Sequence, residues 1–239
     1  MSIEGIYIAT EASAQMQSLE NATLVEGRGI EGDRYCSTTG TYSCLRVSRL
    51  REGQREPGRQ ITLISADSVK RTLQAKGMTC PADIGNLRRN VVLQGISGDE
   101  LLRAIGHVIQ LGDTCRVLVH RNCVPCMYNE RKNCIPGMME AIWDCAGVAC
   151  EVLVGGKIQT GNTIQVLWDE NREIDGGLQA SGYYVRPKER TAQMVKDDLA
   201  AKREAKQALL KIDPVGVQRA ESSYNSVGIN FWPADKHGV

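Results

Sequence analysis

Short apolar runs rich in β-branched residues, separated by glycine turns, recur along the chain up to about residue 168. Runs of this kind predict strands, and glycine pairs predict the turns between them. Strand and helix do not alternate regularly, which disfavours a doubly wound parallel sheet. The sequence therefore predicts an α+β, mainly β fold with a barrel-like core and a few helices. The expected strands cover residues 3–9, 59–64, 90–94, 107–111, 115–119, 148–154 and 163–168.

Helices are expected at few places in this β-rich part. Ser65 is of the type that caps a helix start, and the following residues predict a helix to about Lys76 that Gly77 ends. A second helix is expected over residues 138–145. Residues 36–58 are polar throughout and are interpreted as a long loop.

The composition changes after about residue 170. Residues 187–212 are charge-rich and helix-forming, with a thin apolar stripe, and Pro214 is expected to end this helix. The predicted division is therefore a first domain over 1–169 and a helical C-terminal extension over 170–239. We expect the extension to pack on the core or on a second subunit.

The charges of the chain almost balance, with 29 lysines and arginines against 28 acidic residues. A net charge this small gives no general argument for binding nucleic acid or an anionic membrane. No stretch approaches the roughly 18 apolar residues of a membrane span, and the N-terminus lacks the features of a secretory signal. The expectation is a cytoplasmic protein with reduced thiols that binds neither nucleic acid nor membrane.

Six of the nine cysteines fall between residues 115 and 150, and this segment is the strongest candidate for chemistry. A metal or disulfide framework and a single reactive thiolate are the two explanations. His120, Cys123 and Cys126 offer one close set of zinc ligands, but zinc takes four ligands and a second close pair is missing. A zinc-stabilised interaction module stays an alternative. The six are Cys115, Cys123, Cys126, Cys134, Cys145 and Cys150.

Cys126 and Cys123 differ from the other cysteines because they flank a proline in a predicted loop. Arg121 and Arg131 are near in sequence, and a cation beside a thiol favours the thiolate, which is both a nucleophile and a soft metal ligand. Cys126 is therefore the candidate reactive or metal-ligating residue. Cys123 is its candidate partner in persulfide or disulfide exchange, and also its rival.

Arginines near glycine or asparagine form the second candidate feature. Arginine forks hold phosphate or carboxylate in a bidentate manner, although solvated surface charge explains any single arginine equally well. The Arg88-Arg89 pair directly precedes an apolar strand, where a ligand can be gripped. The candidate ligand-binding residues are Arg34, Arg59, Arg88, Arg89 and Asn90.

Six short motifs, taken in chain order, resemble those of the MOSC domain, the C-terminal domain of molybdenum cofactor sulfurases. Each motif alone is weak, but their order is shared across about residues 3–168. They are G-I-x-G-D-R at 29–34, R-Q-I-T-L-I at 59–64, N-L-R-R-N at 86–90, I-G-H-V at 105–108, C-V-P-C at 123–126 and G-V through G-N-T-I at 147–164.

This resemblance implies a barrel-like β fold and a cysteine that carries sulfur or ligates the molybdenum of a pterin cofactor. By position that cysteine is Cys126, with Cys123 left open. The resemblance also implies that the candidate arginines, with Asn90, hold the pterin phosphate. No other metal is implied.

Family members include cofactor sulfurases and enzymes that reduce N-hydroxylated compounds. The resemblance thus favours an enzyme, either a molybdenum-dependent oxidoreductase or one of sulfurtransferase type. The alternative is a persulfide carrier for the assembly of metal–sulfur cofactors. The desulfurase domain of the sulfurases is absent from this sequence, so a separate desulfurase, an electron-donor protein and a second copy of the chain are the implied protein partners.

Overall fold

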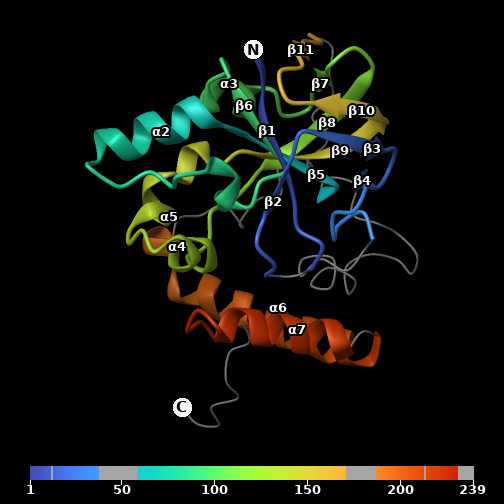
Figure 1. Ribbon diagram of the computed structural model, residues 1–239. Coiled ribbons are helices and arrows are strands. Elements are labelled where there is room, and N and C mark those ends of the chain that lie inside the picture. The colour runs from blue at the N-terminus through green and yellow to red at the C-terminus, as the bar shows by residue number, and fades with distance from the viewer. Residues whose placement is uncertain (12, 38–58, 171–186, 213, 231–239) are drawn as a thin grey trace, which may run out of the picture.

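The structure is a computed structural model that describes residues 1–11, 13–37, 59–170, 187–212 and 214–230 (Figure 1). The long loop predicted over residues 36–58 lies almost wholly outside these residues.

An eight-stranded sheet forms the body of the molecule, with strand order β11-β7-β8-β9-β5-β6-β1-β2. Neighbouring strands are antiparallel except for the parallel pair β5 and β6. A smaller sheet has the order β10-β3-β4. The strands are β1 Ser2–Ile8, β2 Gln17–Leu19, β3 Asn21–Val25, β4 Gly29–Ile30, β5 Ile61–Ser65, β6 Val91–Gln94, β7 Val108–Leu111, β8 Cys115–Asn122, β9 Val148–Val154, β10 Gly156–Gln159 and β11 Ile164–Leu167.

The large sheet curls but does not close into a barrel. The turn between β10 and β11 reaches the start of β1. There the Ile3 N–H donates to the Asn162 carbonyl at 2.9 Å, and the Gly161 N–H donates to the Ile3 carbonyl at 2.8 Å. The prediction of an α+β, mainly β fold is confirmed, and barrel-like describes an open, curled sheet.

Hydrophobic side chains fill both faces of the central strands because alternate residues of a strand point to opposite faces. Leu63 and Val91 lie in the cluster on one face, while Ile64 and Val92 lie in the cluster on the other. All four are essentially inaccessible to solvent. This two-sided burial explains why strands β5 and β6 appear in the sequence as continuous apolar runs rather than as alternating ones.

Helix α2 (Ala66–Ala75) covers the second face (Figure 1), and it begins as predicted. The Ser65 hydroxyl accepts from the Ser68 N–H at 3.1 Å. The helix expected over residues 138–145 is divided into α5 (Met138–Ala141) and the 3₁₀ helix η3 (Trp143–Cys145). Other short elements are η2 (Ile84–Leu87), α3 (Gly98–Arg103) and α4 (Met127–Asn133). Helix α4, directly after Cys126, was not expected.

The C-terminal part contains η4 (Pro187–Glu189), α6 (Ala192–Ile212) and α7 (Pro214–Asn225). Pro214 begins α7 as its first residue, where the missing N–H costs no hydrogen bond, so the expectation that it only ends the preceding helix was incomplete. Lys206 of α6 pairs with Glu221 of α7 at 2.8 Å. The two helices lie beneath α4 in Figure 1.

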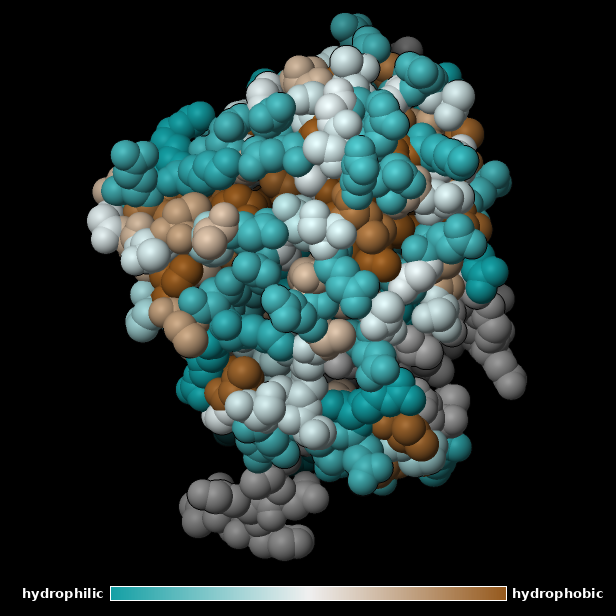
Figure 2. Space-filling view, in the orientation of Figure 1, coloured by the Kyte–Doolittle hydropathy of each residue, from teal (hydrophilic) through white to brown (hydrophobic). Residues whose placement is uncertain are grey.

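The face of the molecule shown in Figure 2 is mostly hydrophilic, with its hydrophobic atoms in several separate patches. Among the described residues, no helix combines the length and the apolar character needed to span a bilayer.

Candidate functional site

Asn90 joins three segments at the start of β6. Its Oδ1 accepts from the Thr62 N–H at 3.1 Å and from the Thr62 hydroxyl at 2.8 Å. Its Nδ2 donates to the Tyr7 carbonyl at 3.2 Å and to the Asp33 carboxylate at 3.3 Å. The buried Asn90 amide therefore connects β1, β5 and the 31–37 loop. These four bonds give it an architectural role beside the predicted ligand-binding one, which stays a prediction.

Asp33 fixes the loop that carries Arg34. The Asp33 carboxylate accepts from the Ala9 N–H at 3.0 Å and from the Tyr35 N–H at 2.9 Å. The Arg34 N–H in turn donates to the Ala9 carbonyl at 2.9 Å. Gly29, at the start of this motif, has φ +117°, and a Cβ there would overlap the Gln60 carbonyl oxygen. The G-I-x-G-D-R pattern thus holds Arg34 at the end of β1.

Arg88, at the end of η2, approaches the loop that carries Arg34. The Asp83 carboxylate caps η2 by accepting from the Gly85 N–H at 2.8 Å, and Arg88 ends η2 in the left-handed region at φ 61°. Its guanidinium donates to the Ala14 carbonyl at 2.7 Å. A positive φ is uncommon for arginine, so the backbone turn sets the direction of this side chain against some strain.

Buried Arg34 and half-buried Arg88 form a pair of like charges. Burial lowers the pKa of Arg88, and the positive charge of Arg34 lowers it further. Burial also opposes the charge on Arg34, but Tyr35 and Asp33 outweigh it and raise the pKa of Arg34. The Arg34 guanidinium carbon lies 4.6 Å from the centre of the Tyr35 ring. Two adjacent guanidinium groups are well suited to holding an anion with several oxygens.

Tyr128 is a candidate site residue that the sequence did not reveal. It is buried on α4, and its electrostatic interactions reach both Arg34 and Arg88. Its hydroxyl bonds with the Ser13 hydroxyl, which in turn bonds with the Ser223 hydroxyl. Burial raises the pKa of Tyr128, but these bonds and the charges of Arg88 and Lys132 outweigh burial, so the net shift is downward. The one feature of the sequence that could have pointed to Tyr128 is its position two residues after Cys126.

The stretch 123–126 follows the end of β8 and leads into α4. The Cys123 N–H donates to the Gly147 carbonyl at 2.7 Å, which fixes the start of the stretch. Cys126 is the extended N-cap residue of α4, and its thiol makes no capping hydrogen bond. Both thiols are partly exposed. The predicted loop is therefore present, and α4 begins directly after it.

Helix α4 rests on η2, which brings the cysteine stretch and the arginines together. The Asn129 side chain donates to the Leu87 carbonyl at 2.7 Å, and the Asn133 side chain donates to the Asn86 carbonyl at 3.2 Å. The Arg89 Nε donates to the Ala146 carbonyl at 2.7 Å, next to the Gly147 that holds Cys123. Cys126, Arg88 and Arg89 thus belong to one junction.

Arg59 directly precedes Gln60, whose N–H donates to the Cys150 carbonyl at 3.0 Å at the start of β5, and its ligand-binding role stays a prediction. The two arginines near the cysteines in sequence have other contacts. Arg131 donates to the carbonyls of Val227 and Gly228 at 3.1 and 2.6 Å. Arg121 is buried near Cys150, and its charge offsets only part of the rise that burial causes in the pKa of that thiol.

The other cysteines of the cluster have separate surroundings. Cys115 and Cys150 are fully buried in β8 and β9, as expected of small core residues. Burial and the nearby Cys123 raise the pKa of Cys150 well above its ordinary value. Cys145 is buried against Thr72, and Cys134 is exposed at the end of α4. Within the described ranges, no three His, Cys, Asp or Glu side chains converge as metal ligands.

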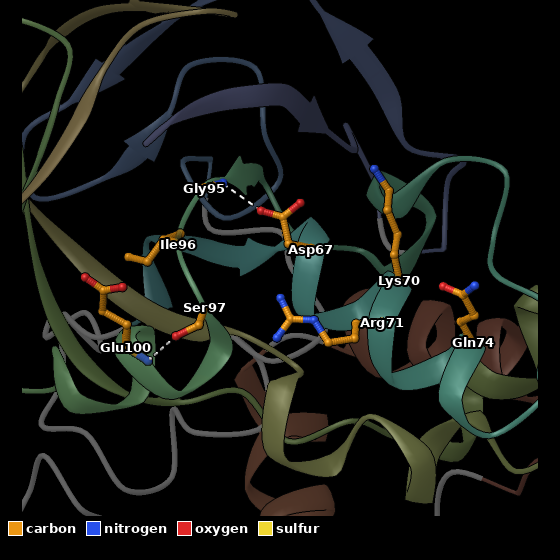
Figure 3. A pocket seen from close by; sticks show the side chains of 8 residues that line it. All are labelled: Asp67, Lys70, Arg71, Gln74, Gly95, Ile96, Ser97 and Glu100. Atoms are coloured by element: carbon orange, nitrogen blue, oxygen red, sulfur yellow. Dashed lines mark hydrogen bonds between the residues drawn. The ribbon is translucent and has the colours of Figure 1, made fainter.

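A pocket of about 660 Å³ lies elsewhere, between α2 and the segment that leads from β6 into α3 (Figure 3). Its charged lining residues include Asp67, Lys70, Arg71 and Glu100. Two of its polar groups are engaged locally, because Asp67 accepts from the Gly95 N–H at 2.6 Å and Ser97 caps Glu100 at 3.1 Å. None of the predicted site residues lines it.

Comparisons with known proteins agree with the fold. The family model of the MOSC domain matches residues 51–165. The solved structure of the YuaD protein from Bacillus subtilis is similar, with a TM-score of 0.54 and 21% identity over 69% of this chain and 93% of that chain. YiiM from Geobacillus stearothermophilus is similar with a TM-score of 0.50 and 16% identity over 87% of this chain and 98% of that chain. A search of curated proteins found no match. Residues 51–165 of this chain therefore match the MOSC domain, and the resemblance drawn from the six motifs is confirmed.

Proposed function

We propose that this protein binds a phosphorylated pterin–molybdenum cofactor at the junction of η2, α4 and the 31–37 loop. The observation that carries the proposal is the pair formed by buried Arg34 and half-buried Arg88, whose like charges repel each other. Keeping two guanidinium groups together away from water is costly, and a phosphate would offer several oxygens to both.

The residues of the junction fit such a cofactor in two respects. Arg34 and Arg88 would hold the phosphate, with Arg89 next to Arg88 in the chain. The partly exposed thiol of Cys126 would ligate the metal, since a soft thiolate suits molybdenum and no capping bond engages this thiol. When bound, the cofactor would supply two-electron chemistry such as the reduction of N-hydroxylated compounds.

The role of the protein in that chemistry would be to bind and to orient. Arg34 and Arg88 would hold the phosphate end of the ligand, and Cys126, at the start of α4, would ligate its metal. Asn90 and Asp33 hold the two arginine-bearing segments in register through their mutual hydrogen bond at 3.3 Å.

The test compares two serine variants of the full chain, each made in a host that synthesises the cofactor. Cys126→Ser and Cys123→Ser change two partly exposed thiols three positions apart, so they are matched controls for each other. We expect Cys126→Ser to lose molybdenum, measured by elemental analysis, and Cys123→Ser to keep it. Pterin fluorescence reports whether the rest of the cofactor still binds. Full molybdenum content in Cys126→Ser would overturn the role of Cys126.

A persulfide carrier is the second candidate function, favoured by the pair of partly exposed thiols in one short stretch. A sulfur held on Cys126 would be accessible to an acceptor, and Cys123 would be near enough to resolve it. Mass spectrometry after incubation with a cysteine desulfurase and cysteine distinguishes the two functions. One added sulfur on Cys126, in a protein without molybdenum or pterin, would favour the carrier.

A further inference from the structure

Helix α7 of the C-terminal extension docks on α4, although the match to the MOSC family model ends at residue 165. Val217, Ala220 and Ser223 are its buried residues and follow each other at intervals of three, which places them on one side of the helix. Just after the C-terminal end of α7, the Val227 and Gly228 carbonyls accept hydrogen bonds from the guanidinium of Arg131. The end of this segment is therefore fixed against α4.

Two adjacent residues of α7 reach Tyr128. The Ser223 hydroxyl bonds with a Ser13 hydroxyl that also bonds with Tyr128. The Tyr224 ring stacks on the Tyr128 ring, with centres 4.7 Å apart and planes inclined by 29°. Helix α7 thus fixes both the ring and the hydroxyl of a residue that faces the arginine pair.

Ser13 connects this contact to Arg88. Its backbone is in the left-handed region at φ 66°, and its carbonyl accepts from the Lys132 ammonium at 2.6 Å. The carbonyl of the next residue, Ala14, accepts from the Arg88 guanidinium at 2.7 Å. A strained serine persists where its surroundings hold it, and here α4 and α7 supply the holding contacts.

We infer that α7 is a positioning element of the arginine site, with Ser223 and Tyr224 acting through Tyr128 and Ser13 on Arg88. This inference rests on the proposed function, because it assigns a role toward the same anion. Helix α7 itself gives no group to the anion. Loss of its two contacts would release Tyr128 and the strained Ser13, and the Ala14 carbonyl that orients Arg88 would move with them.

The experiment measures the affinity of the full chain for inorganic phosphate by calorimetry. Ser223→Ala and Tyr224→Ala are expected to weaken binding by about fivefold each, which corresponds to the loss of one ordinary contact. Ser222→Ala is the matched control on the neighbouring exposed position, and Tyr224→Phe keeps the stacked ring. Both are expected to bind phosphate as the wild type does. Denaturant unfolding of each variant separates this effect from a loss of stability.

Arg88→Gln separates a failure of the arginine site from a failure of the positioning role of α7. If Arg88→Gln loses phosphate binding while Ser223→Ala and Tyr224→Ala retain wild-type affinity, the role of α7 is overturned and the arginine site stands. If Arg88→Gln binds phosphate as well as the wild type, the site is overturned and the inference falls with it. Ser223→Ala removes one buried oxygen, so it keeps the test valid if Tyr224→Ala does not fold.

Discussion

The guanidinium of Arg34 lies close enough to Arg88 to add its repulsion to the burial that already lowers the pKa of Arg88. The two residues come from segments more than fifty positions apart, and each segment is held by hydrogen bonds of its own. Keeping two like charges close together away from water is unfavourable. A bound anion would offset this repulsion and so stabilise the folded protein.

Multivalent anions should therefore stabilise this protein more than chloride does at equal ionic strength. The added stability follows the binding linkage and reaches about 2.7 kcal/mol when the free anion is at 100 times its dissociation constant. Thermal denaturation in phosphate, sulfate and chloride measures it. The phosphate effect should disappear in Arg34→Gln and persist in Arg103→Gln, which alters an arginine of α3 outside this junction. Equal phosphate effects in both variants would contradict the paired site.

Asn90 should matter more for folding than for binding. Replacing it with alanine leaves the Thr62 N–H, the Thr62 hydroxyl, the Tyr7 carbonyl and the Asp33 carboxylate without their amide partner. Each buried polar group that loses its partner costs about 1–3 kcal/mol, so a loss of roughly 3 kcal/mol or more is expected. Urea unfolding measures the loss, with the exposed Asn86→Ala as control. A stable Asn90→Ala variant that fails to bind phosphate would instead favour direct contact with the ligand.

Most of the sheet could be predicted because its strands carry local signals. The β5–β6 pair has continuous apolar runs, and Ser65 and Gly77 flank α2 with the residues that cap and end a helix. Helix α4 escaped prediction because its sequence is polar and its N-cap is a cysteine, which makes no capping bond. It is stabilised instead by tertiary contacts such as the bond from Asn129 to the Leu87 carbonyl.

The candidate site was predictable only in part. The motifs identified Arg34, Arg88 and Cys126, but a sequence does not reveal that Ser13 adopts a positive φ or that Tyr128 faces two arginines. Those features arise from packing between distant segments. The extension was expected to pack on the core or on a second subunit, and its contacts with Tyr128 and Arg131 give the first of these outcomes.

Gly147 should be intolerant of any side chain. It has φ +92°, and a Cβ there would overlap the Leu63 carbonyl oxygen in the neighbouring strand. Gly161 has nearly the same backbone angle, φ +88°, with open space around the Cβ position. Gly161→Ala should therefore cost about 1 kcal/mol for backbone strain alone, whereas Gly147→Ala should cost a further 1–3 kcal/mol for the overlap. Equal losses in urea unfolding would show that the close approach is relieved by movement of the chain.

Gly147→Ala should also disturb the cysteine stretch, because the Gly147 carbonyl accepts from the Cys123 N–H at 2.7 Å. Alkylation rates of Cys123 and Cys126, followed by mass spectrometry under native conditions, report that change. We expect both thiols to react faster in Gly147→Ala and at the wild-type rate in Gly161→Ala.

Tyr7 should make the stability of the protein depend on alkaline pH. Burial, followed by the hydrogen bond and the negative charge of Asp83, raises the pKa of Tyr7 to about 12. The unfolded value is 10.0, so the folded state favours the neutral phenol. The contribution is complete below pH 10 and is lost as the pH rises from 10 to about 12. Asp83 also caps η2, so this loss acts on the element that presents Arg88.

Urea midpoints of the wild type and Tyr7→Phe, measured between pH 8 and about pH 11.5, isolate this contribution. Other lysines, tyrosines and cysteines titrate in both proteins, so their effects cancel in the difference. The wild type should be the more stable at pH 8 to 10, because phenylalanine cannot donate to Asp83, and its advantage should shrink steadily above pH 10. A constant difference over the whole range would mean that Tyr7 has its ordinary pKa in the folded protein.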